Sequence, residues 1–354
     1  MKNILIASLI YLSLGASIFA QSNDNLDQTL SNLSRDAVNA YISPAVSGFG
    51  SNLNSGWVSK LPSASKMSLY VDFKIIGMGS FFSNNKKDFL ITGQVRFTDQ
   101  QADEILANSG YYFPDPRYVV LKNEMLSKDW TVNISGPTVI GSKSEKAKIE
   151  FPGDQSLGIQ SHTVTIDQVK GLLDNWKIFP SAALQLTVGT IAGTNLSIRY
   201  LPDISRTFGF NDQLGKFTFW GIGFIHNPGV WFMIPLPVDL GIGYFYQKLK
   251  VGNTVESTNS QFGLYVSKSF GFGISFAPYA GLTFESSKTK VTYEYNYDTS
   301  TGPSTLKINL DLEGENSAAL LFGCNVKLSS VVNVNADFKV AKTKTISAGI
   351  SFVF

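Results

Sequence analysis

Apolar and polar residues alternate along most of this 354-residue chain after Lys66. Successive side chains of a β-strand point to opposite faces, so a period of two predicts strands with one apolar and one polar face. Clear examples cover residues 238–247, 272–285 and 332–340. A strand that crosses a membrane at a tilt needs about 9–11 residues, whereas strands of soluble proteins are usually about 5–6 residues long. Because many runs reach the membrane length, the pattern favours an all-β, antiparallel transmembrane β-barrel over a soluble sandwich.

The composition agrees with a wall that faces lipid on one side. Charged residues make up 16% of the chain and aromatic residues 13%, and typical soluble domains contain about 25% charged residues. Aromatic side chains collect at strand ends, for example Tyr244 and Tyr246, where an interfacial girdle would place them. The formal net charge is only +2, which argues against a nucleic-acid partner, because such a partner requires a clustered basic surface. Outer-membrane lipid is the expected surrounding.

The final strand ends in Phe354, and counting back in steps of two gives Phe352 and Ile350. A terminal strand that closes on an aromatic residue resembles the signal by which the outer-membrane assembly machinery recognises barrels. Together with the alternation, this ending predicts the outer membrane of a Gram-negative cell as the location and the assembly machinery as a partner.

The first twenty residues read as a secretory signal peptide. Lys2 supplies the positive start, residues 4–19 form the apolar region, and small residues precede a cleavage point after Ala20. The alternative is a membrane-spanning helix, which needs about 20 predominantly apolar residues, and this run is shorter and contains Ser13, Gly15 and Ser17. The expected organisation is a signal peptide at 1–20, an N-terminal helix and loop at 21–65, and the barrel at 66–354.

Residues 26–41 predict a short amphipathic helix with one apolar face that needs burial. Proline disfavours the helical conformation in the residue before it, so we expect the helix to end at Pro44. Three glycines then indicate a loop that ends at Trp57. The apolar residues that recur at three- and four-residue spacing are Leu26, Leu30, Leu33, Ala37 and Tyr41.

The number of strands follows from parity, because both ends of such barrels lie in the periplasm. Counting back from the C-terminus makes 272–297 a rising strand and 304–328 a descending strand of one tall external hairpin. Residues 202–215 and 250–258 become external loops, and the proline-rich stretch 227–237 becomes a periplasmic connection. Long external loops and short periplasmic turns are typical of these barrels. One strand within 99–181 gives a total of twelve and three give fourteen; we favour fourteen.

No catalytic or metal-binding pattern is present in the sequence. A Ser-His-acid site needs a histidine beside a serine and a carboxylate, and no motif flanks the two histidines, His162 and His226. No His/Cys spacing suits a metal, so we predict no cofactor and no enzymatic activity. Charges on the polar face of the strands are of mixed sign, which favours pairing across the lumen over a path of one sign. The candidates that line the lumen are Asp72, Arg96, Arg199, Asp239, Asp337 and Lys339.

Several short segments resemble a group of uncharacterised outer-membrane proteins. They are Ala40-Tyr41-Ile42-Ser43-Pro44-Ala45, Asn54-Ser55-Gly56-Trp57, Arg199-Tyr200-Leu201-Pro202, Pro235-Leu236-Pro237 and Pro278-Tyr279-Ala280-Gly281-Leu282. That group is distantly similar to the long-chain fatty-acid transporter family, whose fourteen-stranded barrel is plugged by an N-terminal segment. The resemblance implies that residues 21–65 enter the lumen from the periplasmic side; the alternative is an unpacked periplasmic tail. The candidate plug residues are Leu30, Leu33, Tyr41, Pro44, Phe49 and Trp57.

Three functions follow from these expectations. The first is a plugged channel that passes small hydrophobic molecules across the outer membrane, as the resemblance implies. The second is a non-transporting barrel with a structural or secretion-associated role. The third is a lipid-modifying outer-membrane enzyme, which the missing catalytic pattern disfavours.

Overall fold

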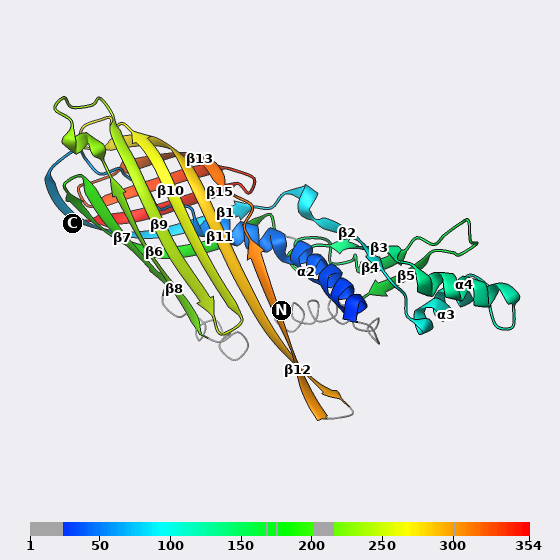
Figure 1. Cartoon of the computed structure of the whole chain (residues 1–354). Helices are drawn as coiled ribbons and strands as arrows, with labels where there is room; N and C mark the ends of the chain where they lie inside the picture. Colours follow the sequence, from blue (N-terminus) through cyan, green and yellow to red (C-terminus); the bar gives the residue numbers. More distant parts are fainter. Residues whose placement is uncertain (1–23, 168, 175, 202–215, 300–301) are drawn as a thin grey trace. The chain divides into compact units, whose positions relative to one another are not determined.

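The structure is a computed structural model that describes residues 24–167, 169–174, 176–201, 216–299 and 302–354 (Figure 1). The chain forms two compact units. The first contains residues up to Pro44 together with Ser83–Trp176, and the second contains Ala45–Phe82 together with Lys177–Phe354. Among the described residues, no helix combines the length and the apolar character that a bilayer crossing requires.

The second unit is a closed antiparallel β-barrel, which confirms the predicted all-β barrel. Its sheet has eleven strands, of which β12 (Gly302–Glu313) pairs only with β11, so ten strands form the closed wall of the described chain. The pairing of β1 with β15 and of β10 with β11 completes the ring. The ten strands are β1 (Met67–Phe81), β6 (Ile178–Ile191), β7 (Thr194–Leu201), β8 (Phe217–His226), β9 (Asp239–Val251), β10 (Val255–Ser267), β11 (Ser275–Thr299), β13 (Ala318–Lys327), β14 (Val332–Val340) and β15 (Thr345–Val353).

The predicted strand number of fourteen, and its alternative of twelve, are wrong. Residues 83–176, which we expected to belong to the barrel, form a separate unit between β1 and β6. The predicted descending strand 304–328 corresponds to β12 followed by β13, which both pair with β11; only its outer part, β12, does not join the ring. Period-two alternation reports one apolar face per strand and cannot distinguish a barrel wall from a small sheet that packs against helices. The tip residues 300–301 of the hairpin lie outside the described residues.

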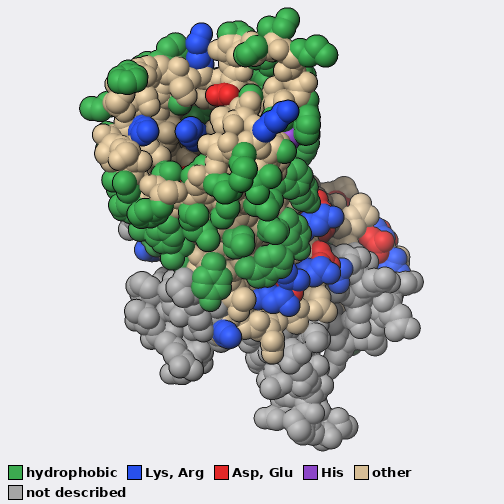
Figure 2. All heavy atoms as spheres, turned by 90° about the vertical axis from the view of Figure 1, so that its left-hand side faces the viewer, with side chains coloured by type: hydrophobic (Ala, Val, Ile, Leu, Met, Phe, Trp, Pro, Cys, Tyr) green, Lys and Arg blue, Asp and Glu red, His purple; other side chains and the backbone are tan. Residues whose placement is uncertain are grey.

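The barrel wall has an apolar outer face and a polar inner face (Figure 2). In β1, Leu69, Val71 and Phe73 are exposed, whereas the alternate residue Lys74 is buried. A contiguous apolar surface of this size is unusual for a soluble monomer and is typical of a wall that faces lipid. Further outward residues from the other strands include Leu186, Leu196, Ile198, Ile222, Phe224, Tyr244, Phe262, Leu264, Phe284, Phe322, Ile346 and Ile350.

The two ends of the barrel carry different connections. The C-terminal rim is the end at which β1 begins and β15 ends, and its connections are 192–193, 227–238, 268–274 and 328–331. The insert rim is the opposite end, at which the chain leaves β1 after Phe81 for residues 83–176 and returns at Ile178. The short turns 252–254 and 341–344 also lie at the insert rim.

The first unit contains a four-stranded antiparallel sheet and two helices. The sheet order is β2 (Asp88–Val95), β3 (Trp130–Pro137), β4 (Ala147–Phe151) and β5 (His162–Ile166). Helices α3 (Asp99–Asn108) and α4 (Pro116–Ser127) lie between β2 and β3 in the chain and bury Ile105, Leu106 and Met125. The ring of Phe151 packs edge-on against those of Phe97 and Trp130, at centroid distances of 5.0 and 5.5 Å.

Helix α2 (Asp24–Leu53) does not end at the predicted position, because Pro44 lies inside it. Proline removes one backbone hydrogen bond within a helix, yet α2 continues past Pro44 to Leu53. Residues up to Pro44 belong to the first unit and residues from Ala45 to the barrel. In the first unit, Tyr41 is buried, its hydroxyl donates to the Lys170 carbonyl at 3.0 Å, and its own carbonyl accepts from the Val139 amide.

Replacing Thr98 by Ala is expected to destabilise α3 by about 1 kcal/mol, the usual cost of losing an N-cap. The Thr98 hydroxyl accepts from the Gln101 amide, and the Gln101 side chain accepts in return from the Thr98 amide. Hydrogen exchange of the α3 amides in the full-length chain should become roughly fivefold faster, since 1.4 kcal/mol corresponds to tenfold. Gln100→Ala, on an exposed side chain of the same helix, is the control. Equal exchange in both variants would show that the cap is not formed.

Candidate functional site in the barrel lumen

The segment 45–65 lies inside the barrel and crosses it from one rim to the other. At the insert rim, the Ser51 hydroxyl lies 2.6 Å from the Thr345 hydroxyl and 3.2 Å from the Thr343 carbonyl. At the C-terminal rim, the Pro62 carbonyl accepts from the Asn227 side chain at 2.8 Å, and the Ser65 carbonyl accepts from the Gly193 amide at 3.1 Å. Every residue from Ser51 to Ser59 is buried. The segment therefore enters the lumen at the insert rim.

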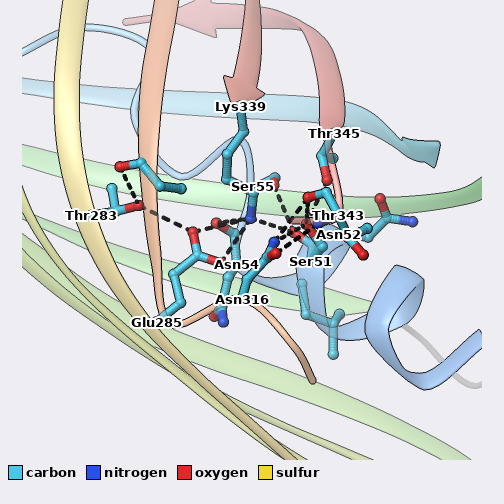
Figure 3. A network of polar contacts seen from close by, with 12 residues as sticks. Ser51, Asn52, Asn54, Ser55, Thr283, Glu285, Asn316, Lys339, Thr343 and Thr345 are labelled. Carbon is cyan, nitrogen blue, oxygen red and sulfur yellow. Dashed lines mark hydrogen bonds and ion pairs between the residues drawn. The ribbon is translucent and has the colours of Figure 1, made fainter. Parts of the chain in front are cut away.

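A polar network holds the segment at the insert rim (Figure 3). The Asn316 side chain donates to the Ser51 hydroxyl at 2.9 Å and to the Thr343 carbonyl at 2.9 Å. The Asn52 amide nitrogen donates to the Phe179 carbonyl at 2.6 Å, and its oxygen accepts from the Ser80 hydroxyl at 2.7 Å. Hydroxyl and amide side chains supply both donors and acceptors, so the segment and the wall satisfy each other's polar groups here.

Three cations of the wall bind backbone carbonyls of the segment. Lys339 Nζ donates to the Ser51 carbonyl at 2.8 Å, Lys74 Nζ donates to the Gly56 carbonyl at 2.8 Å, and Arg199 Nη2 donates to the Ser55 carbonyl at 2.9 Å. These carbonyls lie in or just after the last turn of α2, where backbone oxygens lack intrahelical partners and the helix dipole favours positive charge. The cations are buried, and buried charges are tolerated only when they are paired or hydrogen-bonded.

One of these cations also forms a buried ion pair. Lys339 Nζ lies 2.9 Å from Glu285 Oε2, and both side chains are only 1% exposed. The Thr283 hydroxyl donates to Glu285 Oε1 at 3.1 Å. The pair therefore joins β11 to β14 and, through the Ser51 carbonyl, joins both strands to the segment.

The Arg199 guanidinium is shared among three kinds of partner. Its Nε donates to Gln185 Oε1 at 2.9 Å. Its Cζ lies 3.8 Å from the centre of the Trp57 ring, which is a cation–π contact. Gln185 in turn donates to the Trp57 carbonyl at 3.1 Å, and Gln247 Nε2 donates to the Leu53 carbonyl. The chain turns at Gly56, whose φ is +66°, and a β-carbon there would lie 2.0 Å from Ile76 Cδ1. Only glycine fits both constraints.

Between this polar layer and the C-terminal rim, an apolar cluster fills part of the lumen. Trp57 stacks on Phe245 with ring centroids 4.9 Å apart, and Val58 and Leu61 join the same cluster. The hydroxyl of Tyr279, also in the cluster, donates to the Val58 carbonyl and to Asp337 Oδ2, both at 3.1 Å. The remaining members of the cluster are Ile225, Tyr265 and Leu321.

A cavity of about 220 Å³ opens at the C-terminal rim, the end that Figure 2 faces. Trp57, Lys60, Tyr70, Asp72 and Asn195 are among its lining residues. At about 30 Å³ per molecule the volume corresponds to roughly seven waters. The lining combines one cation, one carboxylate and neutral polar groups with the apolar side chains of Trp57, Val58, Ile225, Phe245 and Val353. The segment fills the lumen beyond the cavity, with Trp57 at its inner side.

The structure brings together four of the six predicted lumen residues. Arg199, Asp337 and Lys339 are buried in the lumen, and Asp72 lines the cavity. Asp239 lies at the C-terminal rim, where Asn227 Nδ2 donates to it at 3.2 Å. Arg96 does not line the lumen; it lies in the first unit, is exposed, and pairs with Asp129 at 3.1 Å. Its prediction was wrong because it followed from counting β2 as a barrel strand.

The predicted plug residues fall into three groups. Phe49 and Trp57 lie in the barrel, and Phe49 packs edge-on against Phe179 with centroids 6.2 Å apart. Tyr41 and Pro44 belong to the first unit. Leu30 and Leu33 lie in α2, and their side chains are outside the described part of the chain.

Sequence reasoning missed the polar residues that hold the segment. Ser51, Asn52, Asn54 and Ser55 form a short polar run before Gly56, and such a run reads as an ordinary loop. The one signal in the sequence is that this run of small, uncharged polar residues directly precedes Trp57. A large aromatic side chain needs burial, and its neighbours would then be buried with it.

The histidines lie away from the lumen network. His226 Nδ1 lies 3.0 Å from the Thr194 hydroxyl and its Nε2 accepts from Trp231, whereas His162 Nδ1 lies 2.8 Å from the Asn108 side chain. Within the described ranges, no cluster of three His, Cys, Asp or Glu side chains could hold a metal ion.

Comparisons with solved structures return bacterial outer-membrane proteins of low similarity. LpxR from Salmonella typhimurium is 9% identical with a TM-score of 0.27, covering 79% of this chain and 99% of its own. A loop-deletion mutant of OmpT from Vibrio cholerae is 8% identical with a TM-score of 0.22, covering 81% of this chain and 98% of its own. The toluene transporter TbuX from Ralstonia pickettii is 8% identical with a TM-score of 0.21, covering 81% and 90%. At such TM-scores the likeness carries no argument about function.

The sequence comparisons give a clearer result. No curated protein matches the chain, and nothing supports the distant similarity to long-chain fatty-acid transporters that the sequence suggested. The model of DUF6588, a family of unknown function, matches residues 1–354, and the chain therefore belongs to this family.

Proposed function

We propose that the protein is an outer-membrane β-barrel that is closed by its own segment 45–65 and that holds residues 83–176 at the outer face of the membrane. Its role is structural, without transport through the lumen. The observation that carries the proposal is the buried run Ser51–Ser59, whose carbonyls bind three wall cations. A segment held by charged hydrogen bonds at several points is a fixed part of the barrel, because each such bond contributes about 1.5–3 kcal/mol.

The apolar outer wall supports a membrane location, since closed barrels are the only β-structures that cross bilayers. The lengths of the connections support the orientation. Outer-membrane barrels have short periplasmic turns and longer external loops, and the longest excursion, residues 83–176, leaves from the insert rim. The C-terminal rim would then face the periplasm.

Cysteine labelling of intact cells tests this orientation. In a Cys324→Ser background, which removes the single native cysteine, Glu145→Cys reports on the first unit and Ser330→Cys on the C-terminal rim; both positions are exposed. A membrane-impermeant maleimide should label position 145 in intact cells and position 330 only after the outer membrane is permeabilised. The reverse pattern would invert the orientation, and labelling of both positions before permeabilisation would contradict insertion.

A plugged channel for small hydrophobic molecules is the second candidate. The apolar cluster around Trp57, Phe245 and Leu61 favours it, because displacement of the segment would expose an apolar surface inside the lumen. A disulfide lock separates the two functions. The Ser51 and Thr345 hydroxyl oxygens are 2.6 Å apart, so two sulfur atoms at these positions come near the bonding distance of about 2.05 Å.

The lock is Ser51→Cys with Thr345→Cys in the Cys324→Ser background, and each single cysteine variant is its control. If the barrel is a fixed structure, cells with the oxidised lock behave like wild type in every uptake assay. If uptake of a hydrophobic compound stops on oxidation and returns on reduction, the protein is a channel and its role is not only structural. The absence of enzymatic activity and of a cofactor, and the recognition of Phe354 by the assembly machinery, stay predictions.

A further inference from the structure

The two longest connections of the C-terminal rim, 227–238 and 268–274, expose large apolar side chains. Met233 and Phe272 are fully exposed, and Ile234, at 79%, is nearly so. Monomeric soluble proteins rarely leave such groups together in water. We name this surface the apolar rim patch; it consists of Trp231, Phe232, Met233, Ile234, Leu236, Phe270, Phe272 and Ile274.

The patch is continuous with the apolar outer wall. Its two connections are separated only by β9 and β10, so they lie about 10 Å apart around the ring, at about 4.8 Å per strand. The Phe270 ring stacks on that of Phe276, with centroids 5.2 Å apart, and Phe276 is an exposed wall residue of β11. Figure 2 shows hydrophobic side chains over the wall and at this rim. The apolar surface therefore extends beyond the strand ends at β8–β11.

The first connection, 227–238, has few backbone N–H groups that need a hydrogen bond from water. Residues 228–237 contain no charged side chain and three prolines, which have no N–H donor. The amides of Val230 and Phe232 donate to the carbonyls of Asn227 and Gly229. The indole N–H of Trp231 donates to His226 Nε2 at 3.3 Å. An unpaired polar group costs several kcal/mol away from water, and most of the donors here are absent or already satisfied.

We propose that the apolar rim patch lies in the interfacial layer of the membrane leaflet on the C-terminal side, with Met233 and Phe272 among the lipid chains. This inference rests on the proposed outer-membrane location. Irregular backbone does not occur in the hydrocarbon core, whereas aromatic side chains concentrate at the interface. The wall then enters the membrane more deeply at β8–β11 than at the two-residue turn 192–193. This difference in depth fixes the tilt of the barrel.

An environment-sensitive fluorophore tests the proposal in vesicles of phosphatidylethanolamine and phosphatidylglycerol that contain spin-labelled lipid. In the Cys324→Ser background, the label is placed by Met233→Cys or Phe272→Cys in the patch, by Phe262→Cys on the wall, and by Asn253→Cys at the insert rim. The labels at 233 and 272 should show blue-shifted emission and quenching by spin-labelled lipid comparable to the label at 262. The label at 253 should show neither.

The wall label separates this inference from the proposed function. Quenching at 262 with water-like emission at 233 and 272 would overturn the inference alone and leave a protein partner as the occupant of the patch. Water-like emission at 262 as well would show that the barrel is not in the bilayer, and both proposals would fail.

Discussion

Deletion of residues 21–65 is expected to turn a closed barrel into an open pore. Ten strands enclose more space than eight, which leave room only for side chains, and here segment 45–65 fills that space. Without it, water replaces the carbonyls that bind Lys74, Arg199 and Lys339. Planar bilayers should show discrete current steps with the deletion variant and a closed baseline with the full-length chain.

Two controls make this result interpretable. Heat-dependent gel mobility must show that the deletion variant is folded, and Arg199→Ala with Lys339→Ala in the full-length chain loosens the segment without removing it. The double variant should give brief, smaller current steps than the deletion. A folded deletion variant that stays closed would contradict the closure of the lumen by this segment, and steps from the unmodified protein would favour the channel.

Some features of the fold could be predicted from the sequence and others could not, because a sequence pattern records only the environment of each side chain. Lipid outside and polar groups inside impose a period of two on every wall strand, so the alternation predicts the barrel and places Arg199, Asp337 and Lys339 on its inner face. The small sheet of residues 83–176 imposes the same period on β2, whose alternate residues are partly buried, because one face of a sheet that packs against other elements is also shielded from water. The strand number and the position of Arg96 therefore could not be predicted from alternation alone.

The partners of the inward charges were hidden for a different reason. We expected the charges to pair across the lumen, yet Arg199 and Lys74 bind backbone carbonyls of the segment. Every residue carries a carbonyl, so no sequence pattern marks the ones that will accept from a cation. The Lys339–Glu285 pair was equally hidden, since its partners are 54 residues apart and meet only through the pairing of β13 with both β11 and β14.

Breaking the buried Lys339–Glu285 pair is expected to destabilise the barrel by about 3–5 kcal/mol, because removal of one partner leaves an uncompensated buried charge. Lys339→Met and Glu285→Gln should each show this loss as a lower free energy of unfolding by urea in phospholipid vesicles. The combined variant Lys339→Met/Glu285→Gln should lose clearly less than the sum of the two. It does not recover fully, because the Ser51 carbonyl keeps the Ser55 hydroxyl as a donor but loses the hydrogen bond from Lys339, and a hydrogen bond to a charged group contributes about 1.5–3 kcal/mol.

The exposed pair Lys288–Glu313 provides the matched control, since it also joins two β-strands but is 3.9 Å apart with side chains 68% and 74% exposed. Lys288→Met and Glu313→Gln should each change the free energy of unfolding by at most about 1 kcal/mol. Additive losses at Lys339 and Glu285 would show that the two side chains act independently. Losses as small as those at the exposed pair would mean that water reaches this part of the lumen, and that the segment does not exclude it.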